Sequence, residues 1–272
     1  MTLLNRVLTG LFDLVFLPFR SLDPLWGLGV VSLVAGILML WIFGKVSDQE
    51  RIRSVRDRIR GNLIGIRLFG DDLGLLFRLQ LRIFRQTLTY LRHALWPMLV
   101  LLIPVLLILV QLNLRFGARP LEPGESTVLT LTLRQASPLE QDVELSVPTG
   151  VTVETPGVRI PSRREVAWRL RVEQPGRHRV TVRAGSDSVE KQLVAGGAWS
   201  AVSTLRTAGL VDGLLYPGEP LIDRTSTIAS VEVRHAPLPL SLFGFGVDWL
   251  LFFFVASLAS GFAFRRLLGV EI

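Results

Sequence analysis

The sequence contains no cysteine and very little lysine or histidine. Without cysteine, disulfides, thiol catalysis and cysteine-based metal sites are excluded. The three histidines, His93, His178 and His235, lack metal-ligand spacing. Lys45 and Lys191 are the only lysines, so the basic charge is almost entirely arginine, a bias that a GC-rich genome also produces. No nucleophile–base pair, carboxylate pair or phosphate loop has credible spacing, so we expect neither an enzyme nor a bound cofactor or metal.

Charge is also absent from three long apolar stretches, Trp26–Gly44, Leu95–Leu114 and Leu250–Phe264. A bilayer requires about 17–25 such residues per helix, and the last stretch reaches that length only with residues before Leu250. We therefore predict an α-helical membrane protein with transmembrane helices at 26–44, 96–114 and 245–264. Within them, the small-residue pairs Ser32 and Gly36, and Ser257 and Gly261, are candidates for close helix packing.

The charge of the connecting segments predicts their sides of the membrane. Residues 47–95 hold ten arginines against five acidic residues, whereas residues 115–240 hold fifteen basic against fourteen acidic residues. Short segments rich in Lys and Arg stay in the cytoplasm, while long domains cross regardless of charge. We expect segment 47–95 and the tail 265–272 to be cytoplasmic, with the N-terminus and residues 115–240 outside, in a bacterial inner membrane.

Residues 1–25 have the pattern of an amphipathic helix lying in the membrane interface. A broad apolar surface leaves one narrow polar stripe. The stripe consists of Thr2, Asn5, Arg6, Thr9, Gly10, Asp13 and Arg20. The alternative is a signal peptide, but a basic start, a clean apolar core and a small-residue cleavage site are all lacking.

Residues 47–95 predict an antiparallel, coiled-coil-like hairpin of two helices. An apolar seam with steps of three and four runs from Ile52 to Ile66, and turn residues at 69–72 separate it from a second helix at 73–95. Asp71 and Asp72 supply too few ligands for a cation and suit a turn. The hairpin either only connects two spans or binds a partner through its arginines, namely Arg51, Arg53, Arg56, Arg58, Arg60, Arg78, Arg82 and Arg85.

From Pro120 onward, short alternating segments separated by Pro and Gly turns predict an all-β, immunoglobulin-like sandwich at 120–195. The expected strands are Thr127–Leu133, Val143–Val147, Val151–Glu154, Val166–Val172, His178–Arg183 and Ser188–Val194, with Trp168 in the core. Residues 196–241 form a connector in which Ile228–Arg234 reads as a further strand. That strand would join the sandwich, pair with another chain or lie on the membrane.

The order of these parts resembles the YidC/Oxa-type membrane-insertase superfamily, and the three-span total is similar to its short branch. The likeness rests on the stretch from Val34 through Gly44-Lys45-Val46, on the tip at Gly70-Asp71-Asp72, and on Trp96-Pro97 through Ile103-Pro104. It covers residues 1–115 and the last span, and the outer β-domain departs from it. Insertases of this family place an arginine in the first core span to make a hydrated groove. In this register Ala35 occupies that position, so the resemblance does not extend to the groove's polar centre.

Two functions follow from this organisation. The first is a non-catalytic scaffold or assembly subunit of a larger membrane protein complex, which the lack of chemistry and of an intramembrane charge favours. The alternative is an insertase-like membrane chaperone whose basic hairpin contacts ribosomes or nascent chains. The expected partners are the lipid bilayer and other membrane proteins, with no specific nucleic acid.

Overall fold

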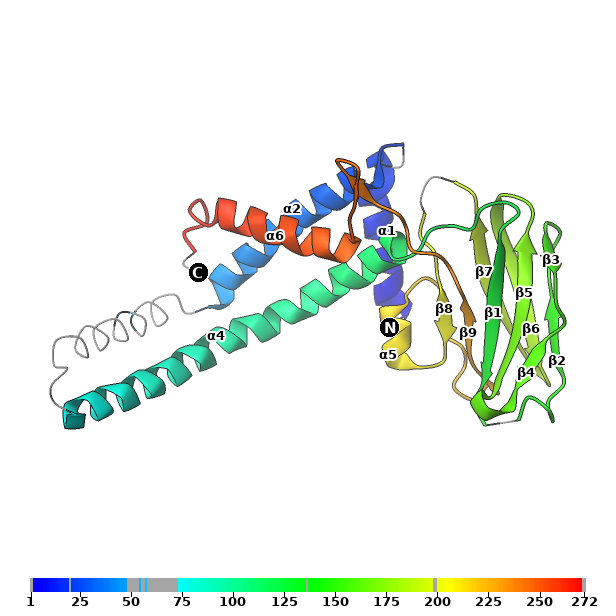
Figure 1. Ribbon diagram of the computed structural model, residues 1–272, viewed down its shortest axis with the longest axis horizontal. Coiled ribbons are helices and arrows are strands. Elements are labelled where there is room, and N and C mark those ends of the chain that lie inside the picture. Colours follow the sequence, from blue (N-terminus) through cyan, green and yellow to red (C-terminus); the bar gives the residue numbers. More distant parts are fainter. Residues whose placement is uncertain are drawn as a thin grey trace. The chain divides into compact units, whose positions relative to one another are not determined.

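The protein combines long helices with antiparallel β-sheets (Figure 1). The computed structural model describes residues 2–19, 21–47, 54, 57, 73–135, 137–197 and 200–270. The chain divides into two compact units. Unit 1 contains Met1–Leu28 and Leu109–Trp249, and unit 2 contains Gly29–Ile108 and Leu250–Ile272.

The N-terminal segment of unit 1 is helical. Helix α1 (Thr2–Phe16) is followed by one 3₁₀ turn, η1 (Leu17–Phe19), and then by α2 (Pro24–Val46). Asp23 begins α2, because its Oδ1 accepts the Leu25 backbone N–H at 2.9 Å, and Pro24 occupies the first helical position. The chain thus changes direction at the Leu-Asp-Pro sequence.

Helix α4 (Leu73–Phe116) is one continuous helix of 44 residues. It contains both the predicted second hairpin helix and the predicted second span, with Pro97 and Pro104 inside it. No turn residues separate the two parts, so the helix continues from the charged part into the apolar part. It ends where the Gly117 N–H donates to the Asn113 carbonyl. The first predicted hairpin helix lies outside the described residues, apart from Ser54 and Asp57, which are helical.

The rest of unit 1 is mainly two antiparallel sheets that face each other (Figure 1). The larger has the order β3-β5-β1-β9-β8, with β4 also paired to β5, and the smaller has the order β2-β6-β7. The strands are β1 (Ser126–Leu133), β2 (Val143–Ser146), β3 (Val151–Val153), β4 (Val158–Ile160), β5 (Glu165–Val172), β6 (Gly176–Ala184), β7 (Asp187–Ala195), β8 (Leu205–Thr207) and β9 (Ile228–Val233). The six predicted strands are confirmed, while β4 was not predicted.

One hydrophobic core lies between the two sheets. Alternate residues of β1 are buried, including Leu129 and Leu131, and they share the core with Val180 and Val182 of β6. Period-two alternation of this kind places every second side chain on one face of a strand. Trp168 is 6% exposed within this core, which confirms its predicted position.

The connector at 196–241 belongs to the larger sheet. Strand β9 pairs with β1 on one side and with β8 on the other, and a short helix, α5 (Leu210–Leu215), lies between β8 and β9. The predicted strand at Ile228–Arg234 is confirmed, and it joins the sandwich. Because the pairing is antiparallel, the start of β1 lies beside the end of β9: the Thr127 hydroxyl donates to the Arg234 carbonyl at 2.5 Å. The first and last strands of the β-domain, residues 117–240, are therefore neighbours in one sheet.

The last segment begins with a two-residue hairpin and ends with a helix. Strands β10 (Ser241–Leu242) and β11 (Phe245–Gly246) pair around a turn in which Phe243 and Gly244 both have positive φ. Helix α6 (Trp249–Phe264) follows. The span predicted at 245–264 is therefore helical only from Trp249, because Phe245 and Gly246 pair in β11 and the next two residues are not helical.

In unit 2, α2 and α6 approach each other closely at Gly36. A Cβ at Gly36 would lie 2.2 Å from the Ser257 carbonyl oxygen and 2.0 Å from the Ser260 Oγ. The Ser260 hydroxyl also donates to the Leu33 carbonyl at 3.2 Å. Of the other residues predicted to pack, Ser32 is fully buried, and a Cβ at Gly261 would be 3.8 Å from the Gly36 carbonyl oxygen. Small side chains thus permit close contact between the two backbones.

Gly36→Leu is expected to destabilise the packing of α2 against α6, because the added side chain meets backbone atoms. Overpacking of this type costs about 1–3 kcal/mol. Gly29→Leu is the matched control, since nothing lies within 4 Å of a Cβ built at Gly29 on the same helix. Thermal unfolding in detergent should show a lower midpoint for the first variant only. Equal midpoints would contradict the close approach.

Candidate functional site: the polar junction of helices α1 and α4

The polar stripe of α1 faces protein. The Asn5 Nδ2 donates to the Gly213 carbonyl of α5 at 3.2 Å. Thr9 and Asp13, one and two helical turns after Asn5, contact the C-terminal end of α4. Positions five, nine and thirteen share one face because residues four apart are neighbours on a helix. The stripe predicted from the sequence is therefore an attachment surface.

Arg115, on the last turn of α4, is the centre of this attachment. Its side chain is 2% exposed. One terminal nitrogen, Nη2, donates to the Asp13 carboxylate at 2.6 Å and to the Thr9 carbonyl at 3.1 Å. The other, Nη1, donates to the backbone carbonyl and to the side-chain Oε1 of Gln111, each at 3.0 Å. A buried charge is tolerated only when it is paired and hydrogen-bonded, and both conditions are met here.

Aromatic rings complete the surroundings of the Arg115 guanidinium. Its Cζ lies 5.6 Å from the ring centroid of Phe12 and 5.5 Å from that of Phe16, distances typical of cation–π contacts. The Phe16 ring also meets Phe116 edge-on, with centroids 5.6 Å apart. We name the set Thr9, Phe12, Asp13, Phe16, Gln111 and Arg115 the polar junction. It links α1 to the last turn of α4.

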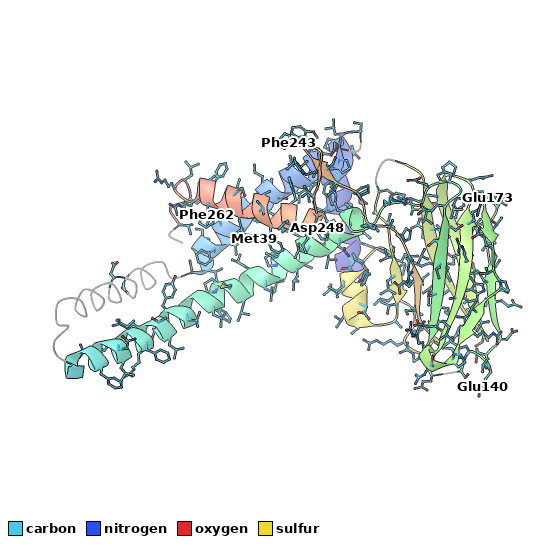
Figure 2. All side chains as sticks on the ribbon, viewed as in Figure 1. Met39, Glu140, Glu173, Phe243, Asp248 and Phe262 are labelled. Atoms are coloured by element: carbon cyan, nitrogen blue, oxygen red, sulfur yellow. The ribbon has the colours of Figure 1, made fainter. Side chains whose placement is uncertain are left out.

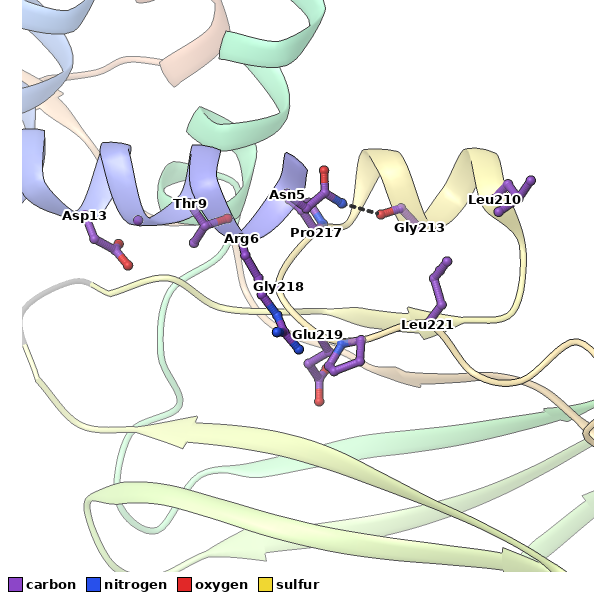
Figure 3. Close-up of a pocket in the computed structure, with 12 residues that line it drawn as sticks. Asn5, Arg6, Thr9, Asp13, Leu210, Gly213, Pro217, Gly218, Glu219 and Leu221 are labelled. Atoms are coloured by element: carbon purple, nitrogen blue, oxygen red, sulfur yellow. Dashed lines mark hydrogen bonds between the residues drawn. The ribbon is translucent and has the colours of Figure 1, made fainter. Parts of the chain in front are cut away.

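A cavity of about 320 Å³ lies between α1 and the loop that follows α5 (Figure 3). Asn5, Arg6, Thr9 and Asp13 line it from α1, and Gly218 and Glu219 are among its lining residues from the loop. A second cavity, of about 350 Å³, shares Thr9, Asp13 and Gly218 with the first. Both cavities therefore border the polar side of α1.

The loop residue Glu219 is anchored by a buried lysine. Lys191 of β7 is fully buried, and its Nζ donates to the Glu219 carboxylate and to the Ser203 carbonyl, the latter at 2.7 Å. The other Glu219 oxygen accepts the Gln192 backbone N–H at 2.8 Å. Burial lowers the pKa of Lys191 below its ordinary value, and the Glu219 carboxylate opposes that shift. This ion pair fixes the loop that faces α1 to the sheet.

An apolar cleft of about 300 Å³ lies in unit 2. Residues of α2, α4 and α6 line it, including Ala35, Val105 and Phe253, and none of its lining residues is charged. Gly36, Ser257 and Gly261 also border it. Ala35, at the position where the resemblance implies an arginine, therefore faces an apolar space.

The arginines predicted to bind a partner are only partly described. Arg82 and Arg85 lie on the exposed surface of α4, and Arg78 lies in the same helix. The positions of Arg51, Arg53, Arg56, Arg58 and Arg60, and the turn at Asp71 and Asp72, lie outside the described residues. In the described part of the chain, no group of three His, Asp or Glu side chains is placed to hold a metal ion.

The sequence interpretation missed the polar junction and the Lys191–Glu219 pair. Gln111 lies within the predicted second span, and Arg115 is the first residue of the segment that charge predicts to lie outside. A signal was present, because Gln111 and Arg115 are four residues apart on α4 as Thr9 and Asp13 are on α1. Nothing in the local sequence connects Lys191 with Glu219, which a sheet and a loop bring together.

Comparison with known proteins adds little to this geometry. No family model matches the chain, and no curated protein matches it. Among solved structures, domains 4 and 5 of the S-layer protein SbsC are similar over 29% of this chain and 46% of that chain, with 15% sequence identity and a TM-score of 0.23. That similarity is too low to carry an argument about fold or function.

Replacing Asp13 should destabilise the polar junction more than replacing Arg115. Asp13→Ala leaves the Arg115 charge buried without its counter-ion, which costs about 3 kcal/mol. Arg115→Met removes that charge and leaves an Asp13 side chain that is already 48% exposed. The double variant should therefore be more stable than Asp13→Ala alone. Unfolding in detergent of the unmodified protein, the two single variants and the double variant measures the coupling between Asp13 and Arg115. Losses of unfolding free energy that simply add in the double variant would contradict this coupling.

Proposed function

We propose that the chain is a non-catalytic scaffold or assembly subunit of a membrane protein complex in the bacterial inner membrane. In this proposal α2, the apolar part of α4 and α6 cross the bilayer. Helix α1 lies in the outer interface, and the two sheets form an immunoglobulin-like domain outside the cytoplasm. The hairpin arginines and the outer domain would then contact partners on opposite faces of the membrane.

The main support for this proposal is that α1 binds protein through its polar side and exposes its apolar side. Its hydrogen-bonded polar residues contact protein, while Val7, Leu11, Leu14 and Val15 on the opposite side are between 40% and 68% exposed. A helix bound to a soluble domain buries its apolar side and exposes its polar side. The reverse arrangement suits a helix whose free side is immersed in lipid. It supports a bilayer directly beside the outer domain.

The long helices support the same conclusion. Two of them, Pro24–Val46 and Gln80–Phe116, are long and apolar enough to cross a membrane. Only 39% and 22% of the residues in their apolar windows are buried within the protein. The core helix of a soluble protein is mostly buried, so lipid is the more suitable surrounding for these side chains.

The contacts of α1 also support the proposed orientation. Asn5 and Asp13 bind residues that belong to, or directly precede, the outer domain. The N-terminus and the outer domain are then on one side of the membrane, as charge segregation predicts. Arg82 and Arg85 would lie on the other side.

The cleft beside Ala35 favours a scaffold over an insertase. A hydrated intramembrane groove requires polar or charged groups to bind water, and the lining residues of this cleft offer almost none. Common ancestry with the insertase superfamily remains compatible with the order of the helices. Activity through a charged groove is not part of the proposal.

Single cysteines introduced into this cysteine-free chain test the orientation. Glu140→Cys, on an exposed loop of the outer domain, should react with a membrane-impermeant maleimide in spheroplasts. Arg82→Cys, exposed on α4, should react only after the membrane is permeabilised. Labelling of both residues from the same side would refute the proposed topology.

Purification in a mild detergent tests the scaffold role. Because the proposal assigns no chemistry to the chain, its function depends on partners, which should co-purify in fixed stoichiometry. Arg82→Ser with Arg85→Ser should weaken the binding of any partner held by the basic surface. Arg179→Ser with Arg183→Ser, at two exposed positions of β6, removes the same charge and serves as the control. Recovery of a monodisperse monomer under all conditions would argue against the proposal.

A further inference from the structure

The β10–β11 hairpin presents aromatic side chains to its surroundings. Phe243 is 92% exposed and Phe245 is 77% exposed, and Leu242 beside them is partly exposed. Figure 2 labels Phe243 at the tip of this hairpin. Exposed aromatic residues on so small an element indicate contact with something outside the chain.

The backbone of Phe243 strengthens this indication. Its φ of 52° lies in the left-handed region, and Gly244 follows with a φ of 85°. A two-residue turn with two positive φ values favours Asn-Gly or Gly-Gly, and a bulky aromatic residue is strained there. The strained residue carries a ring that is almost fully exposed, so the ring itself requires an explanation.

The length of α6 indicates what surrounds the β10–β11 hairpin. Its 16 residues span about 24 Å at 1.5 Å per residue, whereas the hydrocarbon core is about 30 Å thick. The hairpin directly precedes the outer end of α6. Apolar side chains at that end compensate for the missing length, and aromatic rings are favoured at the membrane–water interface.

We propose that the Ser241–Gly246 hairpin inserts Phe243 and Phe245 into the outer leaflet, at the boundary between headgroups and acyl chains. This inference rests on the proposed membrane function. The strand pairing satisfies some of the hairpin's backbone N–H and C=O groups. Water at the boundary can bind the remaining groups, whereas the hydrocarbon core contains no water to do so. The hairpin thereby sets the depth of a short last span.

A fluorescent reporter on the full chain tests this inference. Leu242→Cys carries an environment-sensitive NBD label in vesicles of phosphatidylethanolamine and phosphatidylglycerol that contain nitroxide lipids. A nitroxide near the headgroup should quench the label more strongly than one deep in the acyl chains. The same label at Glu140→Cys, on an outer-domain loop (Figure 2), should not be quenched by lipid.

Phe243→Asn separates the effect of the ring from that of the turn, because asparagine suits the left-handed backbone but lacks the ring. It should reduce quenching at position 242 about twofold or more while the hairpin is retained. Unchanged quenching, or stronger quenching by the deep nitroxide, overturns the inference. Labels that are shielded from water but not quenched by lipid overturn it in favour of a protein partner. Extraction of the chain by alkaline carbonate would instead overturn the proposed membrane function.

Discussion

The buried guanidinium of Arg115 is the constraint on which unit 1 depends. It lies on the last turn of α4, directly before the β-domain, and it donates hydrogen bonds to Asp13 and Thr9 of α1. An unpaired charge at that depth is costly, so α4 and α1 must meet in this register. Helix α1 is thereby oriented with its polar side toward the protein and its apolar side exposed.

The functional proposal follows from this arrangement and from the surfaces that the described residues expose. Lys191 and Glu219 are buried against each other and fix a loop, and the cleft beside Ala35 is apolar. Both are structural features. Among the described residues, the surfaces on which the proposal depends are the apolar face of α1, the turn of the β10–β11 hairpin and the exposed charged part of α4.

Much of this fold could be predicted, because it depends on local patterns. Alternation in Thr127–Leu133 marks β1, and the polar stripe through Asn5, Thr9 and Asp13 marks one side of α1, although not what that side binds. The features that could not be predicted depend on contacts between residues far apart in the sequence. The burial of Arg115 requires Asp13, and the position of β9 within the sheet depends on β1 and β8. The helix predicted to begin at 245 begins at Trp249, because Phe245 and Gly246 pair with Ser241 and Leu242 instead.

The place of β9 in the larger sheet determines when that sheet is completed during synthesis. It lies between β1 and β8, although β1 is the first strand to be made and β9 the last of the five in that row. Until Ile228–Val233 has left the ribosome, the edge of β1 has no neighbour on that side. An unpaired edge on a growing chain is a site for wrong association. Completion of the sheet is therefore coupled to the arrival of the segment that leads into α6.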